Sequence, residues 1–322
     1  MMARAAETVT VDGAERRRRV DRYLAQDGRW GSRSEIQRMI TAGLVCVGGR
    51  SVSADYIVEP GDVISILGEL PVRRMAAVAE DLPLTILYED EDILVLDKPA
   101  PMVVHPAAGH ATGTLVAAVL HHWGGADANL DPVRPGLVHR LDKDTPGVIV
   151  FAKTVRAHAE ISQQFKSRAV RKSYLAFVVG CPSPARGTIA EEIGRHPVHR
   201  KRMAVRPGGR PAVTDYEVIE VGDAMALVQA RPHTGRTHQI RVHFDWLGHP
   251  LVGDPVYGGR RARSSVPWLT RQALHAESLS IRHPRSGDEM EFRAALPDDL
   301  VRLRQELRRG AVGEAKGRPP RA

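Results

Sequence analysis

The chain has 322 residues, of which 43% are hydrophobic and 26% charged, a balance typical of a globular protein with one large domain or with a large and a small one. No apolar run approaches the roughly 20 residues of a membrane-spanning helix, and the N-terminal segment lacks the apolar core of a secretory signal. Cys46 and Cys181 are far apart and form no CxxC pair, which fits a reducing compartment. We therefore expect a cytoplasmic protein with no membrane partner.

The charge balance favours an anionic partner. Lys and Arg number 46 against 38 Asp and Glu, which gives a net charge of +8. A surplus of this sign attracts polyanions, and nucleic acid is the usual one. The alternative is that the basic surface serves solubility alone.

Residues 1–15 show no clear pattern, and we expect a flexible lead. Between residues 16 and 70, the spacing predicts a small module of two helices and a hairpin, with strands at 44–47 and 62–67. The apolar residues that share one face of the second helix are Ile36, Met39 and Ile40. The pattern resembles the small RNA-binding module named after ribosomal protein S-four, and the alternative is an ordinary basic lobe. The arginines that this resemblance implies in RNA binding are Arg17, Arg19, Arg33 and Arg38.

A linker at 71–82 precedes a larger domain, which we expect to span 83–309 before a disordered tail at 310–322. Helices are predicted at 114–123, 154–167 and 297–309. The predicted strands are a pair within 84–99 and single strands at 148–152, 172–180, 212–221, 223–230, 272–282 and 289–293. Strands outnumber helices without a regular βαβ alternation. The fold class is therefore α+β: a small N-terminal α/β module, then a large mixed, mainly antiparallel β-sheet domain with flanking helices.

The segment HRLDKDTPG, residues 139–147, places an acid among basic residues just before a buried strand. Arg140 and Asp142 are two residues apart, so in an extended loop their side chains project to the same side. A carboxylate held against an arginine at the mouth of a strand can be a reagent. The alternative is a charged surface turn.

A second polar cluster spans 231–259 and has an apolar helical face. We expect one helix to carry four basic side chains, Arg236, His238, Arg241 and His243. Such groups are costly to bury without partners. A solvated amphipathic helix remains an alternative, as does a zinc site, although no cysteine or acid stands at typical ligand spacing.

Four segments, in the same order, resemble the motifs of the RluA family of RNA pseudouridine synthases. Residues 139–153 are similar to its HRLDxxTSGxxxxAK signature, 236–258 to its C-terminal motif, 96–106 to its first motif and 171–180 to its tyrosine motif. Together with the N-terminal module, the resemblance covers most of residues 16–295. The sequence HRKRMAV at 199–205 adds a likeness to the RluD type, which implies large-subunit ribosomal RNA as the substrate.

The resemblance implies that uracil is detached from ribose, turned and rejoined through carbon instead of nitrogen, with base flipping. Because this isomerisation involves no net redox change or hydrolysis, we expect no cofactor and no metal. The Walker, HExxH and dinucleotide-binding motifs are also absent from the sequence. The partner implied is RNA, and a monomer is the default expectation.

The catalytic residues that the resemblance implies are Asp142, as nucleophile or base, Tyr174, as a ring against the uracil, and Arg241. We predict that Asp142 and Arg241 are paired, because a guanidinium favours an ionised carboxylate. Tyr174 could alternatively be a core tyrosine of a strand. One departure concerns Pro146, which stands where the family has serine and puts any serine-dependent hydrogen bond in doubt.

Further residues are implied around the RNA and the flipped base, and Arg140 is expected to fill the space that the base vacates. The set is Arg140, His139, Lys98, His105, Arg236, His238, Arg168, Arg171, Lys172, Arg200 and Arg202. The basic segments 165–172 and 199–210 are candidate phosphate contacts, and the alternative is that they are solvated charge runs. Two other functions are open: a non-catalytic RNA-binding ribosome-assembly factor, and a glycoside hydrolase that releases free uracil.

Overall fold

The computed structural model describes residues 7–12, 18–26, 29–30, 33–68, 77–106, 110–127, 130–131, 133–199, 202–264 and 266–313. The chain divides into two compact units, residues 1–74 and 75–322. Two of the residues implied in RNA binding, Arg17 and Arg200, lie outside the described residues. No helix in these ranges has the length and apolarity required to cross a membrane.

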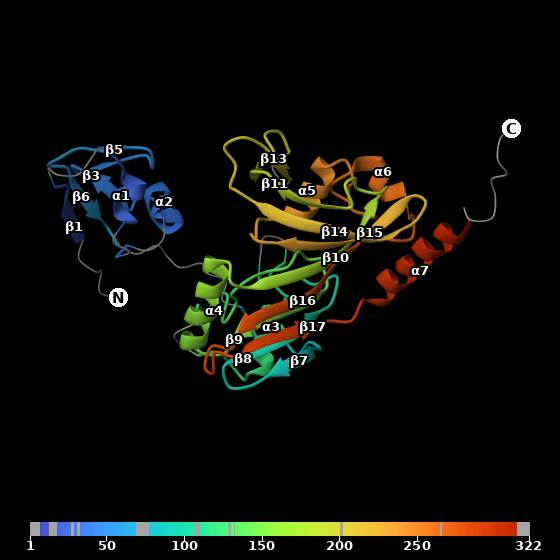
Figure 1. Cartoon of the computed structure of the whole chain (residues 1–322). Coiled ribbons are helices and arrows are strands. Elements are labelled where there is room, and N and C mark those ends of the chain that lie inside the picture. The colour runs from blue at the N-terminus through green and yellow to red at the C-terminus, as the bar shows by residue number, and fades with distance from the viewer. Residues whose placement is uncertain are drawn as a thin grey trace. The chain divides into compact units, whose positions relative to one another are not determined.

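The N-terminal unit combines two helices with short strands (Figure 1). Its elements are β1 (Glu7–Thr10), β2 (Arg18–Arg19), α1 (Val20–Leu24), α2 (Arg33–Thr41), β3 (Val45–Val47), β4 (Arg50–Ser51), β5 (Ile57–Val58) and β6 (Val63–Ile66). One sheet has the order β1-β6-β3-β4, and β2 pairs with β5. The expected apolar face of α2 is buried in the core with Val20 and Leu24 of α1.

The prediction of a flexible lead at 1–15 is wrong for residues 7–10. They form β1, which pairs with β6 in antiparallel register from Glu7 opposite Ile66 to Thr10 opposite Val63. Alternating Thr and Val residues suit a half-buried strand, and Val11 continues into the core. The pattern is short, and its pairing partner lies far along the sequence.

The C-terminal unit is built on one nine-stranded sheet of order β11-β14-β15-β10-β16-β9-β8-β7, with β17 also paired to β16 (Figure 1). Every pairing is antiparallel except that of β16 with β9. The strands are β7 (Thr85–Glu89), β8 (Ile93–Lys98), β9 (Gly147–Ala152), β10 (Arg171–Val179), β11 (Arg186–Ala190), β14 (Val213–Val221), β15 (Met225–Pro232), β16 (Leu274–Arg282) and β17 (Glu289–Arg293). A separate hairpin consists of β12 (Ile193–Arg195) and β13 (Met203–Val205). The mixed, mainly antiparallel α+β architecture is as predicted.

Helices cover both faces of this sheet because successive strand residues point to opposite sides. The helices are α3 (Leu115–His122), α4 (Val155–Ser167), α5 (Gln239–Trp246), α6 (Gly259–Ser264) and α7 (Asp298–Gly313). On β9, Val150 faces α4 whereas Ile149 faces α3. On β10, Phe177 packs with α7 whereas Ala176 packs with α5.

Two boundaries differ from those expected. Residues 77–82, which we expected in a linker, belong to the C-terminal unit: the Glu80 N–H donates to the Ala117 carbonyl, and the Glu80 carboxylate accepts from the Gly113 N–H. At the other end, α7 continues to Gly313 instead of ending at 309. Residues 77–82 lack strong periodicity, so their tertiary contacts define them instead of a local pattern.

The junction of β9 with β16 positions the loop that carries Asp142. The Ala276 N–H donates to the Pro146 carbonyl at 2.9 Å, and Gly147 faces Ala276 across the parallel pairing of β9 with β16. A Cβ on Gly147, whose φ is +118°, would lie 2.1 Å from the Ala276 oxygen. Glycine is therefore required here for the backbones to approach.

Candidate active site

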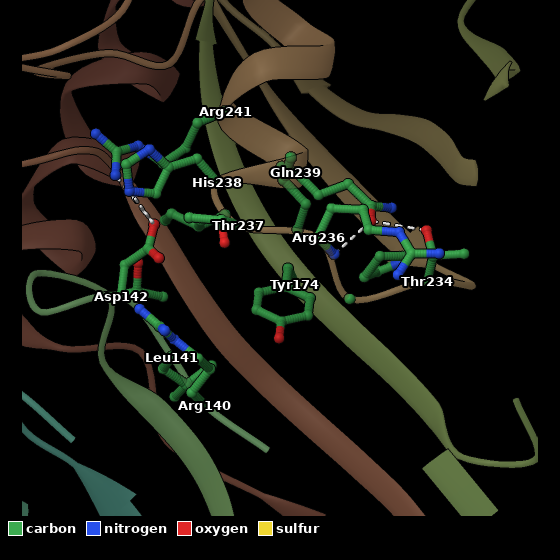
Figure 2. Close-up of a pocket in the computed structure, with 15 residues that line it drawn as sticks. Arg140, Leu141, Asp142, Tyr174, Thr234, Arg236, Thr237, His238, Gln239 and Arg241 are labelled. Carbon is green, nitrogen blue, oxygen red and sulfur yellow. Dashed lines mark hydrogen bonds and ion pairs between the residues drawn. The ribbon is translucent and has the colours of Figure 1, made fainter. Parts of the chain in front are cut away.

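A pocket of about 110 Å³ opens beside Asp142. Its walls come from three places: residues 140–145 before β9, Tyr174 on β10, and residues 232–241 at the end of β15 and the start of α5. Figure 2 shows Asp142, Arg241 and His238 grouped together on one side of the cavity, with the Tyr174 ring inside it. The two polar clusters of the sequence therefore form one site.

Internal hydrogen bonds hold the Asp142 loop. The Thr145 N–H donates to the Asp142 carbonyl at 3.1 Å, and Gln272 Nε2 donates to Thr145 Oγ1 at 3.1 Å. Pro146 contributes its carbonyl to Ala276, so the N–H that proline lacks is not needed for this contact. The side chain of Asp142 is 18% exposed and reaches the pocket.

Arg241 bridges two carboxylates. Its Nη1 donates to Asp142 Oδ2 at 3.0 Å, while Nε and Nη2 donate to the two oxygens of Asp254 at 2.7 and 2.9 Å. The predicted Asp142–Arg241 pair is thus confirmed. Burial by itself lowers the pKa of Arg241, but the hydrogen bonds and charges of Asp254 and Asp142 outweigh it and raise the pKa above its ordinary value. The guanidinium is a permanent cation that keeps one N–H on Asp142.

Asp254 is the anchor of this arrangement, and sequence reasoning did not single it out. It is fully buried, and its Oδ1 also accepts from the Val256 and Tyr257 N–H groups at 2.8 and 3.0 Å. An Asp that caps N–H groups two and three residues ahead is a common turn device. The signal was present in GDPVYG at 253–258, inside the C-terminal motif.

The expectation that one helix carries Arg236, His238, Arg241 and His243 is wrong for the first two. Helix α5 begins at Gln239, and His238 precedes it with a left-handed backbone, φ 56°. The cause is Gln239, whose Oε1 accepts from Thr234 Oγ1 and from the Arg236 N–H, while its Nε2 donates to Val213 and Thr214. These bonds hold the preceding loop open toward the pocket, and the role of Gln239 was not predicted.

The His238 ring lies within the site. Its Nδ1 is 2.8 Å from the Tyr257 hydroxyl, and its Nε2 is 3.9 Å from Asp142 Oδ2. Burial lowers the pKa of His238, and the nearby Asp142 carboxylate only partly opposes this. The imidazole is therefore neutral at neutral pH.

The Tyr174 ring lines the pocket from β10, next to a register shift between Ser173 and Tyr174 in the pairing with β16. Its flanking residues Leu175 and Phe177 point into the core on the other face. Burial, together with the negative charge of Asp142, raises the pKa of the Tyr174 hydroxyl well above its usual value. The hydroxyl stays protonated and the ring offers an aromatic surface.

Two residues expected near RNA have internal partners instead. Lys98 is fully buried, and its Nζ donates to the carbonyls of Pro99, Met102 and Lys143 at 2.9 to 3.0 Å, so no N–H is left for RNA. Burial is the main cause that lowers its pKa to about 7. His139 accepts from the Val150 N–H through Nε2 at 3.1 Å and stacks on Phe165, and burial lowers its pKa to about 3.

His105, also expected near RNA, is 8% exposed and does not line the pocket. Burial lowers its pKa to about 4, with help from the charges of Arg134 and Arg140. His243 also has an internal role, since its Nδ1 contacts Thr214 Oγ1 at 2.9 Å and the ring is fully buried. The sequence pattern alone does not predict which of its histidines are buried.

The other basic residues lie at or near the surface. Arg140 is exposed and lines the pocket, and Arg236 lines it too while its Nε donates to the Pro211 carbonyl. Arg168 is exposed at the end of α4 with a left-handed backbone. The remaining ones have protein partners: Arg171 pairs with Glu289, Lys172 Nζ donates to the Thr234 carbonyl, and Arg202 lies 3.9 Å from Asp245.

In the N-terminal unit, Asp21 organises two of the implied arginines. The Asp21 carboxylate is fully buried, and Oδ2 accepts from Arg19 and Arg33 at 3.0 Å. Both arginines remain partly exposed: 37% of the Arg19 side chain and 46% of the Arg33 side chain are accessible to solvent. Arg38 lies in the last turn of α2. Within the described ranges, no three His, Cys, Asp or Glu side chains are grouped to hold a metal ion.

The chain is similar to several known proteins. Residues 92–246 match the family model described as RNA pseudouridylate synthase, and residues 18–64 match that of the S4 domain. The chain is 40% identical to an uncharacterized RNA pseudouridine synthase of Bacillus subtilis over 94% of this chain and 98% of that one. It is 42% identical to ribosomal large subunit pseudouridine synthase D of Nitrosomonas europaea, over 90% and 84%.

A solved structure, human RNA pseudouridylate synthase domain containing 1, superposes with a TM-score of 0.54 at 30% identity. The match covers 71% of this chain and 96% of that one.

Proposed function

This chain belongs to the RNA pseudouridine synthase family, and we propose from that premise that it isomerises specific uridines of large-subunit ribosomal RNA in the pocket beside Asp142. The S4 domain at its N-terminus binds RNA in this proposal, and the enzyme works as a monomer in the cytoplasm. The choice of RNA rests on the relatives named ribosomal large subunit pseudouridine synthase D.

The observation that carries the proposal is the pair of Asp142 and Arg241 at the wall of a pocket that also holds an aromatic ring. A guanidinium bound to a carboxylate interacts favourably with the charged form, and either possible role of Asp142 uses that form. Asp142 attacks the ribose or removes a proton from it, and the bond from ribose to the uracil nitrogen breaks. When the ribose then bonds to a uracil carbon, the bond to Asp142 breaks or the ribose proton is returned. The proton displaced from that uracil carbon ends on the nitrogen.

The pocket residues have separate tasks in this reaction. Tyr174 offers a ring on which the uracil stacks, worth about 1–3 kcal/mol. Extruding a base from a helix costs a few kcal/mol, so stacking alone leaves little surplus. Arg140, which is exposed at the rim, supplies a cation and a long side chain that can occupy the space the base has left. Base flipping therefore needs both residues.

The test is Asp142→Asn in the full-length protein, incubated with large-subunit ribosomal RNA that lacks pseudouridine. We expect wild type to convert discrete uridines, and the variant to convert none while binding RNA with unchanged affinity. A wild-type protein that binds this RNA without converting uridine would support the assembly-factor alternative. Release of free uracil in stoichiometric amounts would indicate a hydrolase.

A further inference from the structure

His238 has contacts that the reaction described above does not use. It has a left-handed backbone although it is not glycine, a conformation that is disfavoured for L-residues and is found mainly where surrounding contacts impose it. Its ring lies between the Tyr257 hydroxyl, 2.8 Å from Nδ1, and Asp142 Oδ2, 3.9 Å from Nε2. Figure 2 shows His238 and Arg241 on the same side of the Asp142 carboxylate.

The hydrogen-bond partners of Tyr257 determine which ring nitrogen carries the proton. Tyr257 is 1% exposed, and its hydroxyl accepts from the Met203 N–H at 3.0 Å. A buried hydroxyl also needs an acceptor for its own proton. Across the described part of the chain, His238 Nδ1 is the only acceptor within hydrogen-bonding distance of that oxygen. Tyr257 therefore donates to Nδ1.

The neutral imidazole must then carry its single proton on Nε2. Four charged groups face this ring: Asp142, Arg140 from the same loop, Arg241 from α5, and Asp254. Burial lowers the pKa of His238 despite the two carboxylates, so the neutral form prevails. Nε2, which carries this proton, lies 3.9 Å from Asp142 Oδ2, the oxygen that also accepts from Arg241.

We propose that His238 is a positioning residue: Tyr257 sets its tautomer, and its Nε2–H is a second, uncharged donor that orients the Asp142 carboxylate for reaction. The inference rests on the proposed function, in which Asp142 is the reactive group. A neutral donor orients a carboxylate while weakening its nucleophilicity less than a second cation would. Contacts of this kind are often long without substrate and shorten in the complex.

Two amide variants separate this role from a purely structural one. His238→Asn tolerates the left-handed backbone best and can accept from Tyr257, but its short amide does not reach Asp142. His238→Gln is longer and places an N–H near the position of Nε2. We expect Gln to keep the single-turnover rate within about threefold and Asn to lose roughly tenfold, the value of about one hydrogen bond, with KM unchanged. If Asn equals or exceeds Gln, the positioning role is wrong.

A direct measurement needs no activity. In full-length protein labelled with ¹⁵N-histidine, we expect His238 to show a protonated Nε2 and an unprotonated Nδ1, and Tyr257→Phe to remove this preference. The opposite tautomer in wild type contradicts the inference. Asp142→Asn distinguishes failure of the proposed function from failure of this inference. If Asp142→Asn stays active, the proposed role of Asp142 is wrong. If Asp142→Asn is inactive and His238→Asn is fully active, only the positioning role of His238 is wrong.

Discussion

Arg241 lies 3.0 Å from Asp142 and is itself held by both oxygens of the fully buried Asp254. The guanidinium is 5% exposed, whereas the Asp142 side chain is 18% exposed and open to the pocket. The cation therefore has a fixed position set from the interior, and the reactive carboxylate is placed against it. This order of support, from Asp254 through Arg241 to Asp142, explains how a surface loop can hold an acid accurately.

The guanidinium of Arg241, which donates to two acids at once, leads to a first prediction. Lysine keeps the charge but cannot donate to both acids in fixed directions. We expect Arg241→Lys to lower the single-turnover rate by about 10- to 100-fold and the free energy of unfolding by about 2 kcal/mol. Arg186→Lys is a matched control, because Arg186 is 79% exposed in its pair with Glu217. An Arg241→Lys rate equal to that of wild type would show that the planar guanidinium is not required.

Tyr174 permits a test of stacking against hydroxyl chemistry. Tyr174→Phe keeps the ring, whereas Tyr174→Leu removes it. Since stacking on a base is worth about 1–3 kcal/mol, we expect Leu to weaken binding of the flipped substrate by roughly 5- to 150-fold and Phe to retain it. Steady-state KM and single-turnover rates measure both effects. Equal losses in Phe and Leu would assign the role to the hydroxyl.

Lys98 stabilises the loop that carries Asp142. Lys98→Met removes the donors to three carbonyls, including that of Lys143, which directly follows Asp142. Leaving buried carbonyls without donors costs about 1–3 kcal/mol. We expect urea denaturation to show a loss of that size, and the single-turnover rate to fall because the Asp142 loop is released. Unaltered activity with lowered stability would limit Lys98 to a structural role.

Glu220 connects α7 to the sheet and predicts a pH dependence. Its carboxylate accepts from Arg304 and Arg308, and the hydrogen bond from Arg308 is the largest cause that lowers its pKa from 4.5 to about 2. Because the folded state holds the ionised form, this stabilisation is present above pH 4.5 and is lost as the pH falls toward 2.

Replacing Glu220 by Gln should therefore cost roughly 1 kcal/mol at pH 7, since both arginines are partly exposed. The stability difference between wild type and Glu220→Gln should shrink as the pH is lowered below 4.5. Urea denaturation at pH 7 and pH 4 measures it, and catalysis at pH 7 should be unaffected. A difference that is constant with pH would show that the ion pairs do not contribute.

Local pattern was sufficient for much of the fold. The expected strands at 212–221 and 272–282 correspond to Val213–Val221 and Leu274–Arg282, and the expected helix at 154–167 to Val155–Ser167. These elements have strong period-two or helical patterns, because each buries one face against the sheet. The resemblance to the family motifs, and not the spacing of the residues, implied Asp142, Tyr174 and Arg241 as members of one site.

The sequence by itself thus determined the α+β class, the family and which loop carries the acid, since these depend on residues close together in the chain. Tertiary structure alone decided what surrounds the acid. Asp142 and Arg241 are 99 residues apart. The internal contacts of Lys98 with the Lys143 carbonyl and of His139 with Phe165 join separate segments, and the left-handed turn at His238 follows from contacts of Gln239 with Thr234 and β14. Burial, donor direction and charge compensation arise between distant segments, and no local pattern contains them.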